Sequence, residues 1–467
     1  MGDAQAGERV NARFQILLAL VLVAVGVLVA NVVPPVAPRL PGEPEVADAI
    51  ATGVWLCPHG GGEEWRTSLH LANPGASEVR ARISTFDEEG RAASEERTVP
   101  AGGSIAVPID AETRATSSMV EYFGGWIAAG WVTRAAGDQR GVAAEPCAAG
   151  TADTWYLPDA STVDEEDDEI VVMNPFEADA VFSLTLLTPG RAPVRTDAIT
   201  NVFLEGRSSI AVKLGRTVLG EATVATVLEV AVGRVAAAMV GVTGTTGLRA
   251  VLGYPGMPSP GVVLPGGDDR GGSELVLMVP GSGTPALAAT LLGQGEPQPV
   301  GLLADAQLPG GAARAFPVAT APASAIVPTA PGAPAARRAF GRGEDPASTV
   351  GALPGPAWVV LPSVAGGPYH PGIVVANPGE TAATVVLRPL RPGAQPVTLV
   401  VPAQSAVAAP SAFAEANADV AILVLATGGT VVPAGASSSL GKDGRAAYAT
   451  ALGVPVPAAF LEAFLPG

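Results

Sequence analysis

Three histidines are the first residues in this chain that could carry out acid–base chemistry. His59 and His370 are expected in loops after short strands, and His70 within a strand between two inward-facing leucines. A hydrolase triad would need one of them next to an acid and facing a nucleophile. The sequence has neither a G-x-S-x-G elbow nor an H-E-x-x-H helix. We interpret each histidine as a solvated or edge residue, and expect no catalytic residues and no enzyme.

The densest run of charge could in principle bind a cation. Calcium takes roughly six to eight oxygen ligands, often from clustered carboxylates in extracellular modules. The run lacks the D-x-D-x-D-G spacing of a preformed calcium loop. A solvated, self-repelling loop is the default interpretation and weak calcium binding the alternative, with no other metal and no cofactor predicted. The run consists of Asp164, Glu165, Glu166, Asp167, Asp168 and Glu169.

One concentration of aromatic residues could contact a ligand. Tyr122, Trp126 and Trp131 lie within ten positions of one another. Exposed aromatic faces stack on sugar rings, but aromatic side chains also bury the most area per residue in a core. The pattern favours ordinary core, and a candidate ligand contact is the alternative.

The chain has two cysteines, Cys57 and Cys147. A metal or redox pair would need further ligands or a C-x-x-C spacing, and neither is present. Outside the cytoplasm two such thiols oxidise. A disulfide between them would close a loop of about 90 residues and would stabilise the fold by roughly 4 kcal/mol in the chain-entropy model. We therefore predict a structural disulfide.

Two landmarks recur along the chain and define the elements that carry these residues. The first is a short apolar strand ending in proline, and the second is an Asn-Pro turn, with Val279 in place of asparagine in the third copy. The two prolines are 15 to 17 residues apart in every copy, and the copies recur about every 100 residues, the size of a small β-sandwich. The strands are 55–58, 155–158, 262–265 and 359–362, and the turns begin at 73, 174, 279 and 377.

Each copy has the pattern of a β-sandwich. In the first, about seven alternating strands are separated by turn residues roughly every 8–12 positions. The predicted fold class is therefore mainly β, with an N-terminal transmembrane helix followed by four tandem Ig-like β-sandwich repeats. A β-propeller of paired blades is the alternative, because it has the same period. The predicted segments are a cytoplasmic N-terminus (1–13), a signal anchor (14–33), a Pro-rich stalk (34–52) and repeats at 53–150, 151–257, 258–356 and 357–467.

The anchor is predicted from twenty uncharged positions, 14–33. As a helix they span roughly 30 Å, the thickness of a hydrocarbon core. Arg9 and Arg13 precede the segment and no charge follows until Arg39, so the N-terminus is expected in the cytoplasm and the repeats outside it. A cleaved signal peptide, which would release the protein, is the alternative. The predicted location is the plasma membrane, as a single-pass protein.

Charge and composition narrow the class of partner. The formal net charge is −17, and lysine occurs only as Lys213 and Lys442. A basic cluster that could follow a phosphate backbone is absent, so we expect no nucleic-acid partner. The hydrophobic content of 48% argues against a disordered chain, although Gly and Pro are abundant.

The turn motifs carry a resemblance to known proteins. Leu71-Ala72-Asn73-Pro74-Gly75 and Trp155-Tyr156-Leu157-Pro158 resemble motifs of secreted bacterial β-sandwich repeats. Anchor and repeats together resemble an uncharacterised actinobacterial family, domain-of-unknown-function family 5719. This resemblance implies an envelope-exposed protein with no assigned reaction. The expected function is a non-enzymatic, membrane-anchored scaffold of the adhesion type with an envelope protein partner, or alternatively an accessory protein that binds envelope polysaccharide or supports its assembly.

Overall fold

The computed structural model describes residues 52–90, 93–135, 141–163, 168–243, 247–266, 272–319, 323–340, 346–362, 369–440 and 446–462. These residues belong to one compact unit, Ile50–Gly467. Strands joined by short turns account for most of them. The predicted anchor at 14–33 and nearly all of the stalk lie outside the described residues. Among the described residues, no helix has the length and hydropathy to cross a bilayer.

The first repeat forms two antiparallel four-stranded sheets. One has the strand order β1-β6-β3-β4 and the other β5-β2-β7-β8. Alternating apolar residues explain why they pair face to face: Leu69 and Leu71 of β2 are fully buried, as predicted. The strands are β1 (Gly53–Cys57), β2 (Trp65–Asn73), β3 (Val79–Phe86), β4 (Ala93–Val99), β5 (Gly103–Ile109), β6 (Ser117–Phe123), β7 (Ala128–Ala135) and β8 (Val142–Pro146).

The second repeat has the same order, with one short strand added. Its sheets are β12-β11-β14-β9-β17 and β13-β10-β15-β16. The elements are β9 (Thr154–Ala160), β10 (Glu169–Asn174), β11 (Ala180–Leu187), η1 (Asp197–Ile199), β12 (Val202–Leu204), β13 (Ser208–Lys213), η2 (Leu214–Arg216), β14 (Val224–Val232), β15 (Ala236–Thr243), β16 (Gly247–Leu252) and β17 (Tyr254–Pro255).

The third repeat keeps the topology although its sequence has drifted most. Its sheets are β18-β23-β20-β21 and β22-β19-β24-β25. The elements are β18 (Leu264–Gly266), β19 (Gly272–Val279), β20 (Ala289–Leu292), β21 (Gln298–Pro299), η3 (Gly301–Leu303), β22 (Ala312–Val318), β23 (Ser324–Pro328), β24 (Ala335–Phe340) and β25 (Pro346–Val350).

The fourth repeat adds two short helices. Its sheets are β29-β28-β31-β26-β34 and β30-β27-β32-β33. The elements are β26 (Ala357–Val360), β27 (Tyr369–Asn377), β28 (Ala383–Pro389), β29 (Val397–Val401), β30 (Ser405–Ala408), α2 (Ser411–Ala416), β31 (Ile422–Thr427), β32 (Val432–Leu440), β33 (Ala446–Leu452), β34 (Val454–Pro455) and α3 (Ala458–Leu461).

The mainly β fold and the repeated two-sheet unit confirm the coarse prediction, but the strand order corrects its Ig-like detail. In an immunoglobulin domain the first strand pairs with the second, and the seventh with the sixth. Here β1 pairs with β6, and β7 pairs with β2. The described sheets are not propeller blades either. A blade is built from strands that are consecutive in the sequence, whereas neighbouring strands in these sheets are often far apart in the repeat, as β1 and β6 are.

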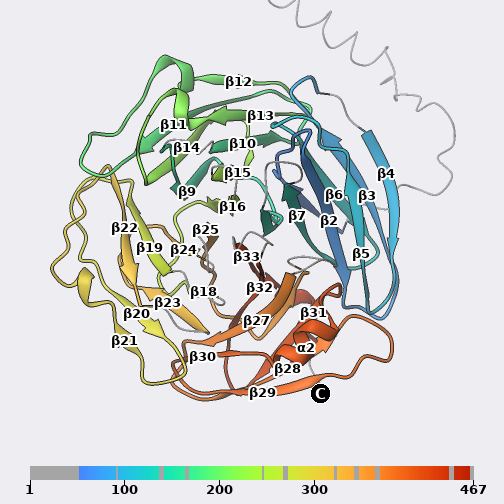
Figure 1. Cartoon of the computed structure of the whole chain (residues 1–467). Coiled ribbons are helices and arrows are strands. Elements are labelled where there is room, and N and C mark those ends of the chain that lie inside the picture. Colours follow the sequence, from blue (N-terminus) through green and yellow to red (C-terminus); the bar gives the residue numbers. More distant parts are fainter. Residues whose placement is uncertain are drawn as a thin grey trace, which may run out of the picture. The chain divides into compact units, whose positions relative to one another are not determined.

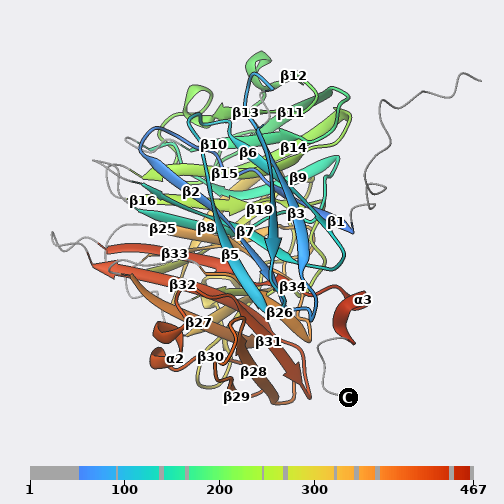
Figure 2. The same cartoon turned by 90° about the vertical axis from the view of Figure 1, so that its right-hand side faces the viewer.

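The repeats close on one another around a common centre. The last strands of their second sheets contact in sequence: β8 with β16, β16 with β25, β25 with β33, and β33 with β8. Figure 1 shows β16, β25 and β33 near the centre and β4, β12, β22 and β29 near the rim. Figure 2 shows β8, β16, β25 and β33 close to one another at mid-height of the unit. The contact between β33 and β8 therefore joins the fourth repeat to the first.

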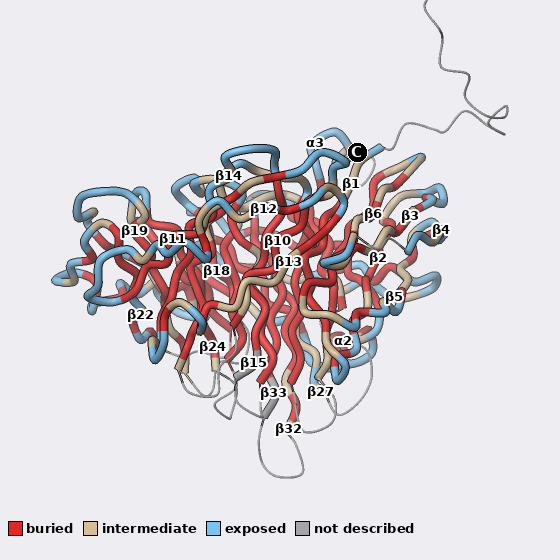
Figure 3. Tube along the Cα trace, turned by 90° about the horizontal axis from the view of Figure 1, so that it is seen from above, coloured by how far each residue is buried: buried red, intermediate tan, exposed pale blue. Residues whose placement is uncertain are grey.

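The hydrophobic cores are shared between repeats, which overturns the expectation of four separate sandwiches. One cluster joins Leu69 and Trp131 of the first repeat to Val240 of the second and Leu423 of the fourth. A second cluster joins Phe86 to Ile170 and Val172 across the first two repeats. Figure 3 shows the buried residues running through the interior of the unit, with exposed residues mainly in the outer loops. Several of the apolar cores therefore extend across the boundaries between repeats.

An asparagine at the end of β2, β10 and β27 explains the repeated Asn-Pro motif. The Asn73 amide donates to Ser77 O at 2.8 Å and to Val99 O at 3.1 Å, and its oxygen accepts from Gly75 N at 2.9 Å. Asn174 and Asn377 make the corresponding bonds. The buried amide thus ties the turn to the end of a later strand. Val279 of the third repeat has no such side chain, and its backbone oxygen accepts a bond from Gly311 N, just before β22.

Candidate functional site

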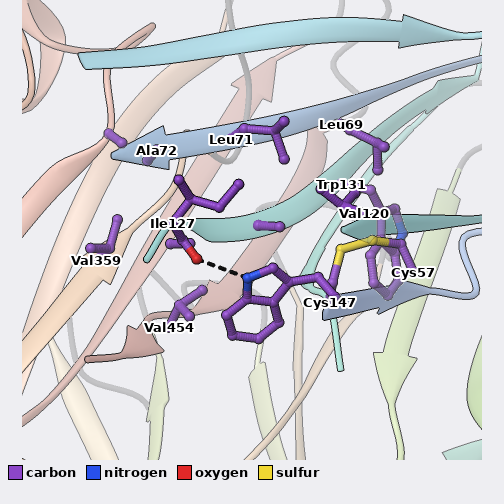
Figure 4. Close-up of a cluster of buried hydrophobic side chains, with 14 of the residues drawn as sticks. Cys57, Leu69, Leu71, Ala72, Val120, Ile127, Trp131, Cys147, Val359 and Val454 are labelled. Atoms are coloured by element: carbon purple, nitrogen blue, oxygen red, sulfur yellow. Dashed lines mark hydrogen bonds between the residues drawn. A yellow bond between two sulfur atoms is a disulfide. The ribbon is translucent and has the colours of Figure 1, made fainter. Parts of the chain in front are cut away.

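The predicted disulfide is present in the first repeat. Cys57, at the end of β1, is bonded to Cys147, which follows β8, with a Cα–Cα distance of 4.6 Å. The bond lies in the core of the repeat, and Figure 4 shows it in a cluster of buried apolar side chains that includes Val120 and Ile127. In the same cluster the indole nitrogen of Trp55 donates to Ile127 O at 2.8 Å. The disulfide joins the two sheets of the repeat, so it is a structural bond.

The aromatic group is buried in the core, which agrees with the favoured interpretation and not with the alternative of a ligand contact. Tyr122, Trp126 and Trp131 are buried, and Trp131 is only 1% exposed. Trp126 packs against Trp55 of its own repeat and Phe460 of the fourth, both at 6.4 Å between ring centroids. These rings therefore join repeats and present no face to a sugar.

Only part of the acidic run lies in the described residues, and that part is already engaged. Asp164, Glu165, Glu166 and Asp167 are outside them. Asp168 is buried, accepts from Ser161 N at 2.6 Å and forms an ion pair with Arg249 of β16. Glu169 begins β10 and is half-buried. Among the described residues, no group of three or more His, Cys, Asp or Glu side chains could hold a metal ion.

Two of the three histidines are buried, contrary to the expectation of solvated residues. His59 is fully buried, with Nε2 2.9 Å from Ser118 Oγ and Nδ1 2.6 Å from Gly60 O. Burial lowers the pKa of His59 to about 4, so the ring is neutral at neutral pH. Because Ser118 is also fully buried, the pair faces no substrate and is structural. His370 is exposed, as expected.

Among the described residues, an extensive buried polar contact joins two repeats and was not predicted from the sequence. Arg338 of β24 binds the carboxylate of Asp159 in β9, with Nε–Oδ1 and Nε–Oδ2 distances of 3.1 and 3.2 Å. Ser348 Oγ donates to Asp159 Oδ2 at 2.5 Å, and Arg338 Nη1 also contacts Glu274 at 3.2 Å. Burial alone would raise the pKa of Asp159, but the charges of Arg338 and Arg249 and the bonds from Arg338 and Ser348 hold it below its usual value. The pair links the second and third repeats.

Two grooves on the first repeat are the candidate binding site. The larger, which we call the acidic groove, has a volume of about 410 Å³. Its lining comes from β3, β4, the end of β5 and the segments that follow β3 and β5. Carboxylates dominate its polar groups, and Ile83 and Phe86 supply apolar surface. The carboxylates are Asp87, Glu95, Asp110 and Glu112.

The second, which we call the arginine groove, has a volume of about 270 Å³ and lies over β2, β5 and β7. Arg66, Ser68, His70 and Arg134 supply its polar lining, and none of its described lining residues is acidic. Pro108 and Ile109 of β5 line both grooves, so one strand separates surfaces of opposite charge. One pattern could have indicated this groove, because Arg66, Ser68 and His70 alternate along a single strand.

Comparison with known proteins supports part of the resemblance seen in the sequence. A model of a family of unknown function, DUF5719, matches residues 121–330, which is less than half of the chain. The range runs from within β6 of the first repeat to just beyond β23 of the third. No curated protein matches this chain. The predicted resemblance to that family is confirmed over this range.

Two solved structures align with long stretches of the chain at very low similarity. One is a Ca²⁺-stabilised adhesin that helps an Antarctic bacterium bind ice, at 10% identity over 87% of this chain and 99% of that chain, with a TM-score of 0.12. The other is a tetra-tandem repeat from the extending region of a large adhesion protein, at 11% identity over 82% and 93%, with a TM-score of 0.09. At these TM-scores neither alignment carries an argument about fold or function.

Proposed function

We propose that this chain is a non-enzymatic, single-pass membrane protein whose repeats form an extracytoplasmic scaffold and binding platform of the cell envelope. The observation that carries the proposal is the closure of the four repeats through shared cores and buried polar contacts. A unit closed in this way holds its outer loops and grooves in fixed relative positions, which suits a protein that presents surfaces to partners.

The disulfide supports the proposed location. Disulfides persist in oxidising compartments and are rare in the cytosol, and Cys57–Cys147 closes a separation of 90 residues within the first repeat. The uncharged segment 14–33, preceded by Arg9 and Arg13, supplies the proposed anchor and its orientation.

The location is tested by treating intact cells with a protease and an impermeant thiol-blocking reagent after reduction. The proposal predicts that the impermeant reagent labels Cys57 and Cys147 once their disulfide has been reduced and the repeats unfolded, because both lie outside the membrane. It also predicts that the protein stays in the membrane fraction with its N-terminus uncleaved. Recovery of the repeats in the cytoplasm would contradict it. Recovery in the medium with a new N-terminus near residue 34 would replace the anchor with a cleaved signal.

The two grooves favour a second candidate function, which is binding of envelope polysaccharide. Ligand sites are concave and combine apolar surface with a few polar groups, and both grooves have this character. Cross-linking in cells separates the two candidates: a protein partner favours the scaffold, and a glycan retained on the purified protein favours the polysaccharide function.

A further inference from the structure

The arginine groove is built from one face of three neighbouring strands. Along β2, Arg66, Ser68 and His70 point to the same side because they are two positions apart, and Trp65, Thr67, Leu69 and Leu71 point into the core. Ala106 of β5 pairs with His70, and a small side chain there leaves the surface hollow.

The register places two like charges directly opposite each other. Arg66 of β2 pairs with Arg134 of β7. Like charges at directly opposed positions of an antiparallel pair are destabilising. The chain has 44 acidic residues against 27 Lys and Arg, and yet no carboxylate is among the described residues that line this groove. A positive site of this kind, in an acidic protein, is the arrangement expected where an anion binds.

Each of the two guanidinium groups, of Arg66 and of Arg134, is held in place by neighbouring groups. Arg66 Nη1 donates to Glu63 O and Trp65 O, both at 3.1 Å, which leaves Nε and Nη2 as donors for a ligand. The Cζ of Arg134 lies 5.7 Å from the ring centroid of Tyr369, which belongs to the fourth repeat. The groove therefore depends on the contact between the first and fourth repeats.

Ser68 and His70 complete the polar lining between the arginines. Ser68 Oγ lies 3.2 Å from His70 Nε2. Burial and, to a smaller extent, the charge of Arg134 lower the pKa of His70 to about 4, so the ring is neutral at neutral pH.

We propose that Arg66 and Arg134, with Ser68 and His70 beside them, form a subsite for an oxyanion carried on a single sugar-sized unit of an anionic glycan. Arginine forks match the planar carboxylate and the phosphate group, and both are bound through charge-assisted hydrogen bonds. The volume of about 270 Å³ lies just below the range of roughly 300–1,000 Å³ for drug-sized ligands, which suits one acidic unit. The inference deepens the polysaccharide function proposed above and rests on it.

The test is a calorimetric titration of the full-length protein in neutral detergent with three probes: glucuronate, inorganic phosphate and glucose. The proposal predicts saturable binding of glucuronate, phosphate or both, weakening as salt is raised, and no binding of glucose. Glucuronate alone would identify a carboxylate ligand and phosphate alone a phosphate ligand. Absence of binding by both anions would overturn the proposal.

Variants locate the binding in the groove. Each of Arg66→Gln and Arg134→Gln should weaken binding about tenfold, because each removes a charge-assisted bond. Arg66→Lys, which keeps the charge but loses the fork, should fall between wild type and Arg66→Gln. The matched control is Arg80→Gln, an exposed arginine on β3 of the same repeat that is outside the groove. Unchanged binding in Arg66→Gln, or an equal loss in Arg80→Gln, would contradict the proposal.

Folding and function are controlled separately. Circular dichroism and melting curves show whether Arg134→Gln, which loses the contact with Tyr369, still folds. Arg66 is exposed, so Arg66→Gln tests the role of the groove in anion binding even if Arg134→Gln does not fold. Membrane location and glycan retention are measured in cells, without these probes. The proposed function and this subsite can therefore fail independently.

Discussion

The guanidinium of Arg338 in the third repeat and the carboxylate of Asp159 in the second form an ion pair inside the protein, with Arg338 Nε 3.1 Å from Asp159 Oδ1. Asp159 is fully buried and the side chain of Arg338 is 8% exposed. The residues are 179 positions apart in the chain. The attraction within a buried ion pair offsets the cost of desolvating its two charges only when the geometry of the pair is good. The pair therefore favours the one relative placement of the second and third repeats that gives this geometry.

Replacing Arg338 with Ala should destabilise the whole unit. The substitution leaves Asp159 buried without its counter-charge, which typically costs about 3–5 kcal/mol. Urea unfolding followed by circular dichroism measures the change. The double variant Arg338→Ala/Asp159→Asn should recover part of the loss, because the orphaned charge is removed.

An exposed ion pair provides the matched control for Arg338. Arg207 and Glu177 lie 3.0 Å apart with side chains 56% and 82% exposed. Arg207→Ala should therefore cost no more than about 1 kcal/mol. Equal costs for the two arginines would show that the buried pair does not join the repeats.

Glu145 of β8 should be a site where a neutral side chain stabilises the protein. Both of its carboxylate oxygens are buried without a hydrogen bond of good geometry. Burial raises its pKa well above the ordinary 4.5, and the backbone of Leu252 offsets only part of this. The folded state thus keeps a proton that the unfolded state loses above pH 4.5, so this residue's contribution to stability is lost as pH rises.

Glu145→Gln should therefore raise the unfolding free energy at pH 7 relative to wild type. The difference should grow by about 1.4 kcal/mol per pH unit above pH 4.5 for as long as the folded carboxyl stays protonated. Urea unfolding at several pH values measures it. A difference that is the same at pH 4 and pH 7 would argue against a neutral buried carboxyl.

His59 should make the protein sensitive to mild acid. Its pKa is about 4 in the folded state because the ring is buried, against 6.5 when unfolded. Its contribution is fully present above pH 6.5 and is lost as pH falls from 6.5 to 4, by about 3 kcal/mol in all. His59→Gln should flatten this decline, whereas His370→Gln, at an exposed position, controls for the substitution. A wild-type stability that does not change between pH 7 and pH 4 would contradict the expectation.

Asn73 should be required for the turn that follows β2. Asn73→Ala removes two donated bonds and one accepted bond and leaves buried backbone groups unpaired, at a cost of about 1–3 kcal/mol. Asn73→Asp keeps the acceptor for Gly75 N but places a negative charge beside two carbonyl oxygens, so it should cost more. Thermal melting ranks the two variants. If Asp is tolerated better than Ala, the donated bonds are not what holds the turn.

Local patterns in the sequence were sufficient to predict the repeats. Alternation in β2 predicted which residues point inward, and the Asn-Pro turns marked equivalent places in the chain. The cysteines at the two ends of the first repeat predicted the disulfide. Each of these features depends on residues within one repeat.

Contacts between repeats could not be predicted in the same way. Asp159 and Arg338 are ordinary strand residues in sequence, and nothing near either one indicates its partner. Trp126 was expected in the core of the first repeat, but nothing near it in sequence indicated that it packs against Phe460 of the fourth. Gly130 of β7 gave no signal either, although a Cβ there would lie 2.7 Å from Leu361 of the fourth repeat. The error of expecting separate sandwiches has the same origin, since the period of about 100 residues marks each repeat but not the apolar residues that contact another repeat.

The central claim is that four repeats close into one body, and small-angle X-ray scattering of residues 50–467 tests it most directly. A single compact unit of that length should have a radius of gyration of about 22 Å. The account predicts this value together with one cooperative unfolding transition. A much larger radius with an elongated distance distribution, of the kind given by four sandwiches in a row, would contradict it.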